Sequence, residues 1–318
     1  MADRPDEAPW IQGLVRQGPL RLTVFLLAVV ISVGHIWANL FGTVSTFYQN
    51  GFHFAGFALL CALTLPASNS AWAQSLPMRV VDLIIGLAVA ASAIFLVLQE
   101  SAIYDRGVRL LPAEWIAGTI VILGAIELTR RTTGWIIPIL ILTALSYVGL
   151  WGAAIDGVFR FAGLSWETLM FRSIYGDDAI FGTIARISST FVFMFILFGA
   201  FLLKSGAGEF IIDLARCIAG RFIGGPGFVA VMASGLTGTI SGSAVANTAS
   251  TGVITIPLMK RSGLPASFSG GVEAASSTGG QLMPPIMGAG AFVMASTTFI
   301  PYGHIVAMSV LPAILYFA

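Results

Sequence analysis

The chain has 318 residues, of which 57% are hydrophobic and 10% are charged, and its formal net charge is +1. Soluble domains carry about 25% charged residues, so this composition, with a mean hydropathy of +0.90, excludes a mainly soluble protein and predicts an all-α integral membrane protein. The near-neutral charge indicates no nucleic-acid partner, and the two isolated cysteines, Cys61 and Cys217, predict neither a disulfide framework nor a transition-metal site.

Residues 1–19 are charged and contain proline, and we expect them to form a cytoplasmic tail. They lack the continuous apolar core and small-residue cleavage site of a signal peptide. A membrane-spanning helix needs about 20 predominantly apolar residues, and the pattern that follows predicts several spans, the second of them short and tilted or partly buried. They are expected at residues 20–41, 52–65, 80–99, 115–128, 134–152 and 181–203.

Basic residues predict the orientation of these spans, because cytoplasmic loops are enriched in lysine and arginine. With a cytoplasmic N-terminus, the tail arginines, Arg79 and the Arg130–Arg131 pair all fall on the cytoplasmic side. Residues 204–221 and the Lys260–Arg261 pair fall there too. Within the former, residues 209–221 mix apolar and charged positions in the pattern of a helix lying on the membrane surface.

This charge placement predicts a re-entrant hairpin. Since the basic groups on both sides of residues 226–259 share one side of the membrane, that segment must enter and return, as two half-depth helices. Its tip falls near SGSAVANTA, at positions 241–249. Polar backbone at membrane depth is tolerated only where protein or a watery cavity covers it, so the tip belongs in a site.

The tip offers oxygen atoms to a ligand. Hydroxyl, amide and carbonyl oxygens suit a hard cation such as sodium, and glycine allows a close approach of the backbone. Helix packing by small residues is the alternative. The candidate residues for binding a cation or substrate here are Ser241, Gly242, Ser243, Asn247 and Thr248.

A broken helix is expected after the hairpin. Residues 268–277 suit a helix, Pro284 and Pro285 cannot continue it, and residues 286–299 resume it. In secondary transporters, half-helix N-termini attract anions and unwound carbonyls bind cations, whereas the alternative is a simple proline kink. The candidate residues at the break are Thr278, Gly279, Gly280, Gln281, Pro284 and Pro285.

Glu273 is the only acidic residue between Asp213 and residue 318, and it lies beside the expected break. A carboxylate within the membrane is costly and is a functional candidate by default. It is either a protonatable coupling group or a structural carboxyl bonded to nearby serine or threonine. The three histidines, His35, His53 and His304, are interpreted as hydrogen-bonded polar residues rather than ligands.

Positions 191–295 carry a long resemblance to the large membrane subunit of TRAP (tripartite ATP-independent periplasmic) transporters, and in particular to fused permeases of the TAXI subclass. The matching sequence includes GFVAVMASGLTGTISGSAVANTASTGVITIPLMKRSGLPASFSGGVEAASSTGGQLMPPIMGAG, at 227–290. Earlier residues, with ELTRRTTGWIIPIL at 127–140, resemble the small four-helix subunit fused in front, plus a connecting helix. GTIARISST, at 182–190, departs from the smoother apolar run of the family because it contains Arg186.

The resemblance implies an elevator-type transporter with two inverted repeats, each contributing a re-entrant hairpin and a broken helix. It implies a small-subunit-like domain at 20–132, a connecting helix and external segment at 133–180, and the first half of the transport domain at 181–318. It also implies import of an organic acid, such as a C4-dicarboxylate or a related carboxylate, across the bacterial inner membrane. A periplasmic binding protein would deliver the acid, and sodium or protons would drive uptake, with no other cofactor.

Two alternatives are weaker. An intramembrane hydrolase would need a base near Ser243, but His304 is distant in sequence, and no HExxH motif is present. A non-transporting scaffold is the other alternative. The sequence ends at LPAILYFA within an expected span. We therefore expect it to be the N-terminal portion of a longer permease, with the second repeat beyond it.

Overall fold

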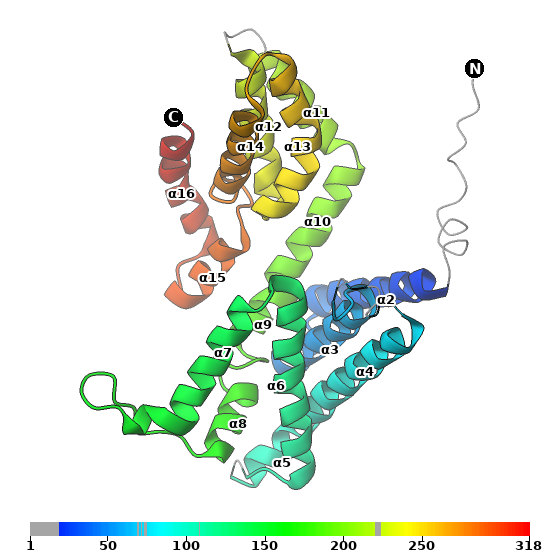
Figure 1. The fold of residues 1–318 in the computed structure, drawn as a ribbon, viewed down its shortest axis with the longest axis vertical. Helices are drawn as coiled ribbons and strands as arrows, with labels where there is room; N and C mark the ends of the chain where they lie inside the picture. Colours follow the sequence, from blue (N-terminus) through cyan, green and yellow to red (C-terminus); the bar gives the residue numbers. More distant parts are fainter. Residues whose placement is uncertain (1–18, 69, 71, 73–74, 108, 220–223) are drawn as a thin grey trace. The chain divides into compact units, whose positions relative to one another are not determined.

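The computed structural model describes residues 19–68, 70, 72, 75–107, 109–219 and 224–318. Within these ranges every regular element is helical and none is a strand (Figure 1), as an all-α membrane protein requires. The predicted tail lies outside the described residues except for its last one, Pro19, which begins the first described helix. Arg221, at the end of the predicted surface helix, also lies outside them.

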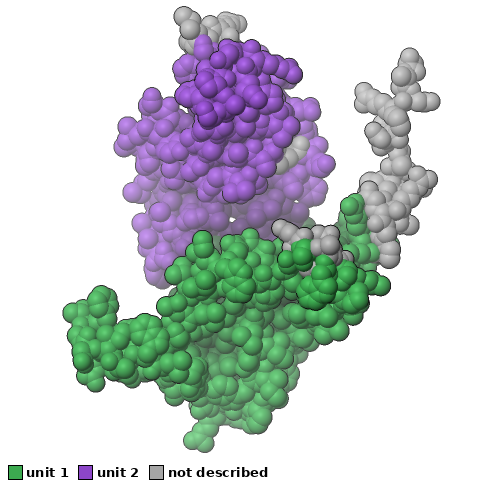
Figure 2. Space-filling model, in the orientation of Figure 1, with its two compact units in different colours: residues 1–189 green, residues 190–318 purple. Residues whose placement is uncertain are grey.

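The chain divides into two compact units, residues 1–189 and 190–318 (Figure 2). Each is described by itself. The division falls inside a helical run that extends from Thr183 to Lys204. Unit 1 therefore contains helices from both sides of residue 133. The small-subunit boundary expected at residue 132 stays a prediction.

Unit 1 contains the helices that precede this division. α3 begins where the Ser45 hydroxyl accepts a hydrogen bond from the Tyr48 amide, and α6 begins where the Glu114 carboxylate accepts one from the Leu111 amide at 2.7 Å. The elements are α2 Pro19–Phe41, α3 Thr46–Thr64, α4 Leu76–Leu98, α5 Glu100–Asp105, α6 Pro112–Thr133, α7 Ile136–Ser146, π-helical η1 Tyr147–Trp151, 3-10 helix η2 Gly152–Ala154, α8 Trp166–Tyr175, α9 Thr183–Ile187 and π-helical η3 Ser188–Val192, which crosses the division.

Small residues let the central helices of unit 1 approach closely. A Cβ atom added at Gly51 of α3 would lie 2.2 Å from the Val97 side chain of α4, and one at Gly124 of α6 would lie 2.3 Å from Val89 of α4. Because lipid is as apolar as leucine, such close van der Waals packing, rather than burial from water, holds membrane helices together. α3 lies at the centre and contacts α2, α4, α6 and α9.

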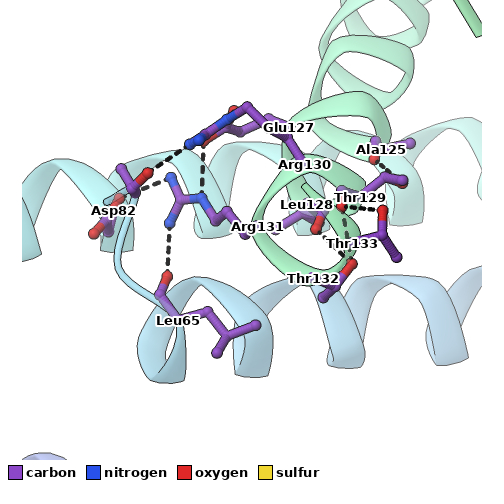
Figure 3. Close-up of polar contacts among 11 residues, drawn as sticks. Leu65, Asp82, Ala125, Glu127, Leu128, Thr129, Arg130, Arg131, Thr132 and Thr133 are labelled. Carbon is purple, nitrogen blue, oxygen red and sulfur yellow. Dashed lines mark hydrogen bonds and ion pairs between the residues drawn. The ribbon is translucent and has the colours of Figure 1, made fainter. Parts of the chain in front are cut away.

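A buried ion pair fixes one end of unit 1 (Figure 3). Arg131 Nη2 lies 2.8 Å from Asp82 Oδ1, and each side chain is 1% exposed. Neither Asp82 oxygen meets a donor with hydrogen-bond geometry in the described part of the chain, so charge attraction holds this contact. Arg131 also binds Glu127 at 2.9 Å and donates to the Leu65 carbonyl at 3.0 Å, which ties α6 to α4 and to the end of α3.

Arg131→Met should lower the free energy of unfolding by about 3–5 kcal/mol, because it leaves the Asp82 carboxylate buried without a cation. Denaturant or thermal unfolding of the purified chain in detergent measures this loss. The double variant Asp82→Leu with Arg131→Met should regain most of it, since both charges are then gone. Arg109→Met, at an exposed position of the same unit, is the control, and an equal loss there would contradict the assignment.

Unit 2 contains a helical hairpin followed by an interrupted helix. α12 packs against α11, α13 and α14, and α14 also contacts α16 (Figure 1). The elements are α10 Phe193–Lys204, α11 Ala207–Ala219, α12 Gly225–Ser241, α13 Ala244–Arg261, α14 Ala266–Gly280, α15 Ala289–Thr298 and α16 Tyr302–Phe317.

A helical hairpin is present where the re-entrant hairpin is predicted, and its helices are longer than half-depth. Its re-entry into the membrane stays a prediction. α12 has 17 residues and α13 has 18, which at 1.5 Å per residue gives about 25 Å for each. A bilayer core is about 30 Å thick, so each arm is long enough to reach most of the way across it.

Five helices among the described residues are long and apolar enough to cross a membrane. They coincide with five of the predicted spans and support a multi-pass membrane protein. The remaining predicted span, at residues 52–65, lies in α3 and is not among the five. The five segments are Leu20–Phe41, Leu76–Leu98, Pro112–Thr133, Ile136–Ala154 and Thr183–Leu202.

Candidate functional site

The hairpin turns at Gly242 and Ser243. Gly242 adopts φ +63°, which glycine tolerates without a steric penalty, and its amide donates to the Gly238 carbonyl at 3.0 Å. Ser243 then begins α13, and its hydroxyl accepts a hydrogen bond from the Ala246 amide at 3.3 Å. Ser241, Gly242 and Ser243 therefore form the tip, as predicted, whereas Asn247 and Thr248 lie within the first turns of α13.

The break in the second helix begins later than predicted. α14 continues through Thr278, Gly279 and Gly280, and the chain becomes helical again only at Ala289 instead of 286. Tertiary packing overrides the low helix propensity of the two glycines. A Cβ atom at Gly279 would lie 2.3 Å from Tyr316 of α16, and one at Gly280 would lie 2.7 Å from the Gly238 Cα atom of α12.

A residue that sequence analysis missed, Thr239 of α12, holds the interrupted segment. Its hydroxyl donates to the Met283 carbonyl at 2.5 Å and accepts from the amides of Ile286 and Met287 at 3.2 and 3.3 Å. Tyr302 donates its hydroxyl to the Ile286 carbonyl. These bonds satisfy backbone groups that the broken ladder leaves without partners, as a segment at membrane depth requires.

The tip and the break line one cavity of about 210 Å³ within unit 2. Ser241, Gly242 and Ser243 contribute one side, and Ile286 and Met287 contribute another. Apolar side chains that include Phe195 and Phe292 line the rest of it. The two segments that the sequence singled out, more than forty residues apart, therefore meet around a single space.

In the same unit as this cavity, Glu273 lies at the centre of a polar cluster. Its side chain is 0% exposed. Its Oε1 atom accepts hydrogen bonds from the hydroxyls of Ser234 at 2.6 Å, Thr251, and Ser277 at 3.2 Å. Its Oε2 atom accepts one from the Thr255 hydroxyl at 2.5 Å. Helices α12, α13 and α14 all contribute, and we call these five residues the carboxyl cage.

Asn247 connects the cage to the hairpin. Its Nδ2 atom donates to the Ser234 carbonyl at 2.8 Å and to the Ser277 hydroxyl at 2.9 Å. The carbonyl needs a donor, which fixes the orientation of the amide. The Oδ1 atom is buried and accepts no hydrogen bond among the described residues. A buried acceptor without a donor costs about 1–3 kcal/mol, so this oxygen is a position at which a donor would bind favourably.

Other predicted residues lie outside the lining of this cavity, and their binding roles stay predictions. Thr278 is exposed and its hydroxyl donates only to the Ala274 carbonyl one turn back, at 2.8 Å. Pro284 lines a separate apolar cavity of about 450 Å³ beside α16, and the Pro285 carbonyl accepts from the Tyr302 hydroxyl at 3.4 Å. Gln281 begins the break, and its carbonyl accepts from the Gly288 amide at 2.8 Å. Thr248 is half-buried beside the tip.

The histidines of unit 1 form hydrogen bonds, as the sequence interpretation expected. His35 Nε2 lies 2.8 Å from His53 Nδ1, and His53 Nε2 lies 3.0 Å from the Ser188 hydroxyl. Nearby, Asn50 donates to the Phe181 carbonyl at 2.8 Å. These polar side chains of α2 and α3 bind the irregular segment around α9.

The family model for "Tripartite ATP-independent periplasmic transporter, DctM component" matches residues 120–318, which is more than half of the chain. The chain belongs to this family. Its members are transporter components rather than enzymes, so the hydrolase alternative has no support. The match includes the hairpin, the break, Glu273 and the carboxyl cage.

Several curated relatives align with part of the chain. It is 35% identical over 121 residues to a C4-dicarboxylate TRAP transporter large permease protein of Pseudomonas aeruginosa, covering 38% of this chain and 28% of that protein. It is 32% identical over 91 residues to a 2,3-diketo-L-gulonate TRAP transporter large permease protein of Escherichia coli (29% and 21%). It is 32% identical over 111 residues to a sialic acid TRAP transporter large permease protein of Vibrio cholerae (35% and 26%).

The chain therefore aligns with less than a third of the length of these relatives. No solved structure matches it.

Gly280→Ala should destabilise unit 2, because its methyl group would push α12 and α14 apart at Gly238. Gly271→Ala on the same helix is the control, since nothing lies within 4 Å of its added Cβ atom and alanine favours a helix by about 1 kcal/mol. Thermal unfolding in detergent should show a lower melting temperature for Gly280→Ala and an unchanged or higher one for Gly271→Ala. Equal melting temperatures would contradict the close contact.

Proposed function

We propose that this chain is part of the permease of a secondary active TRAP transporter in the bacterial inner membrane, with its N-terminus in the cytoplasm. The permease would import an organic acid, a C4-dicarboxylate or a related carboxylate, delivered by a periplasmic binding protein and driven by a sodium or proton gradient. The observation that carries the proposal is the single cavity lined by both the hairpin tip and the helix break.

Helix ends at this cavity suit both a carboxylate and a cation. Ser243, at the N-terminus of α13, and Ala289, at the N-terminus of α15, both line it, and helix N-termini attract anions. Ile240 and Ser241 bring the C-terminal end of α12. The last carbonyls of a helix have no N–H donor within the helix, so they favour a cation. Hydroxyl oxygens of Ser241 and Ser243 are further sodium ligands of the right kind.

The names of the relatives support an acidic substrate, because each refers to a carboxylate or an acid. The choice among such acids depends on residues from the second repeat, which the proposed full-length permease would supply. We further propose that residues 20–132 act as a fused small subunit and that the hairpin and broken helix are the first inverted repeat of an elevator-type transport domain. A non-transporting scaffold is disfavoured, because a scaffold needs no cavity at which a hairpin tip and a helix break meet.

Ser243→Leu in the full-length permease should reduce sodium-dependent uptake of a C4-dicarboxylate to background while leaving membrane insertion intact. The bulky apolar side chain would occupy the cavity and displace oxygen ligands. Uptake into proteoliposomes with the cognate binding protein, with and without a sodium gradient, is the measurement.

Two variants separate this effect from the loss of a helix cap, which costs about 1 kcal/mol. Ser243→Thr keeps the cap oxygen and should retain uptake. Ser45→Leu removes an equivalent cap at the start of α3 in the other unit, and should also retain uptake. Normal sodium-driven uptake by Ser243→Leu would overturn the assignment of the tip as a site.

A further inference from the structure

Within the described ranges, no positive side chain contacts the carboxyl cage. Arg216 of α11, which packs against α12, is exposed and pairs with Asp213. α12 has no ionisable side chain, and α14 has only Glu273. On α13, Lys260 and Arg261 are exposed at the far end of the helix. α16 offers His304 at its exposed start and two tyrosines, Tyr302 and Tyr316, which donate to backbone carbonyls of residues 286 and 275. A fully buried carboxylate without a cation is expensive, so this carboxyl requires something positive to bind.

The cage can satisfy Glu273 in both protonation states, because its two threonines have a choice of acceptor. The Thr255 hydroxyl lies 2.5 Å from Glu273 Oε2 and 3.0 Å from the Thr251 carbonyl. The Thr251 hydroxyl contacts Glu273 Oε1 and lies 2.7 Å from the Asn247 carbonyl. When the carboxylate is charged, both hydroxyls donate to it.

When a proton binds to Oε2, the new O–H group can donate to the Thr255 oxygen. Thr255 then turns its own hydrogen to the Thr251 carbonyl, and Thr251 can turn to the Asn247 carbonyl. One proton is gained, no covalent bond other than the new O–H bond changes, and no hydrogen-bonding group of the cage loses its partner. Such rotating hydroxyl groups donate or accept as needed.

We propose that Glu273 and the cage form the binding site of a coupling proton, with Thr255 as the residue that accepts the hydrogen bond of the protonated acid. The inference rests on the proposed transport function. Asn247 links the site to the substrate cavity, since it binds Ser234 and Ser277 of the cage and lies in the first turn of the helix that starts at Ser243. Its buried Oδ1 atom is an acceptor that a hydrated proton entering from the tip would use.

Infrared spectroscopy of the purified chain tests the proton site without requiring transport. As pH falls, the infrared difference spectrum between wild type and Glu273→Gln should contain the carbonyl band of one un-ionised carboxylic acid. Glu209→Gln, at an exposed position of α11 in the same unit, should leave that band in place. Thr255→Val should shift it, because the acceptor is lost, and Thr255→Ser should not. A Glu273 signal that stays ionised at every pH would overturn the proposal.

Transport by the full-length permease with its binding protein provides the second test. Wild type should acidify the vesicle lumen when a C4-dicarboxylate is taken up, and an inward proton gradient should accelerate uptake. Glu273→Gln should lose both effects but keep exchange of internal for external substrate, which needs no net proton movement. Thr297→Val, at an exposed threonine of α15 whose hydroxyl donates to carbonyls of its own helix, is the matched control for Thr255→Val.

The outcomes separate the two proposals. Absence of any uptake or exchange by the wild-type protein would contradict the transport function, whatever the infrared result. Normal proton movement by the Glu273→Gln variant, whether or not its uptake still depends on sodium, would contradict the proton site alone. If Glu273→Gln fails to fold, the Thr255→Val and Thr255→Ser pair still decides, because both keep the carboxyl and differ only in one hydroxyl.

Discussion

Unit 2 depends on the contact between the backbones of α12 and α14. A Cβ atom at Gly238 would lie 2.9 Å from the Gly280 Cα atom, and 3.2 Å from Asn247 Nδ2. Two glycines are therefore needed for the helices to approach closely enough for hydroxyls of α12 and α14 to reach one carboxyl. Membrane helices associate through such packing and through polar bonds between them. The same approach thus holds the fold together and assembles the carboxyl cage.

One face of α12 connects the cage to the cavity. Ser234, Gly238 and Ser241 follow one another at intervals of four and three residues, which places them on one side of a helix. Ser234 binds Glu273, Gly238 contacts α14, and Ser241 lines the cavity. Thr239, the next residue after Gly238, holds the interrupted segment. A shift of α12 against α14 would therefore change the carboxyl, the break and the cavity together, which is what the proposed coupling of a cation to a substrate would require.

The sequence predicted the hairpin and its tip, and it predicted a break in the next helix but not the residues at which that break begins and ends. Charge placement located the hairpin because lysine and arginine are costly to place in lipid, so they mark the ends of a segment whatever its tertiary packing. Gly279 and Gly280 were expected to break a helix, yet they remain helical because Tyr316 and Gly238 occupy the space that side chains would fill. That is a tertiary contact, and no local pattern reveals it. Ser234, Thr239, Thr251, Thr255 and Ser277 were missed for the same reason.

Glu273 shows why a structural and a functional interpretation need not exclude each other. The hydrogen bonds to serine and threonine that the structural alternative predicted are present, but they do not explain why the residue is an acid. A glutamine of the same shape could bind the same hydroxyls, which donate or accept equally well, and would avoid the cost of a buried charge. What a carboxyl adds is the capacity to gain and lose a proton. Both threonines have a second acceptor one turn back along α13. The cage can therefore bind the carboxyl group with or without its proton.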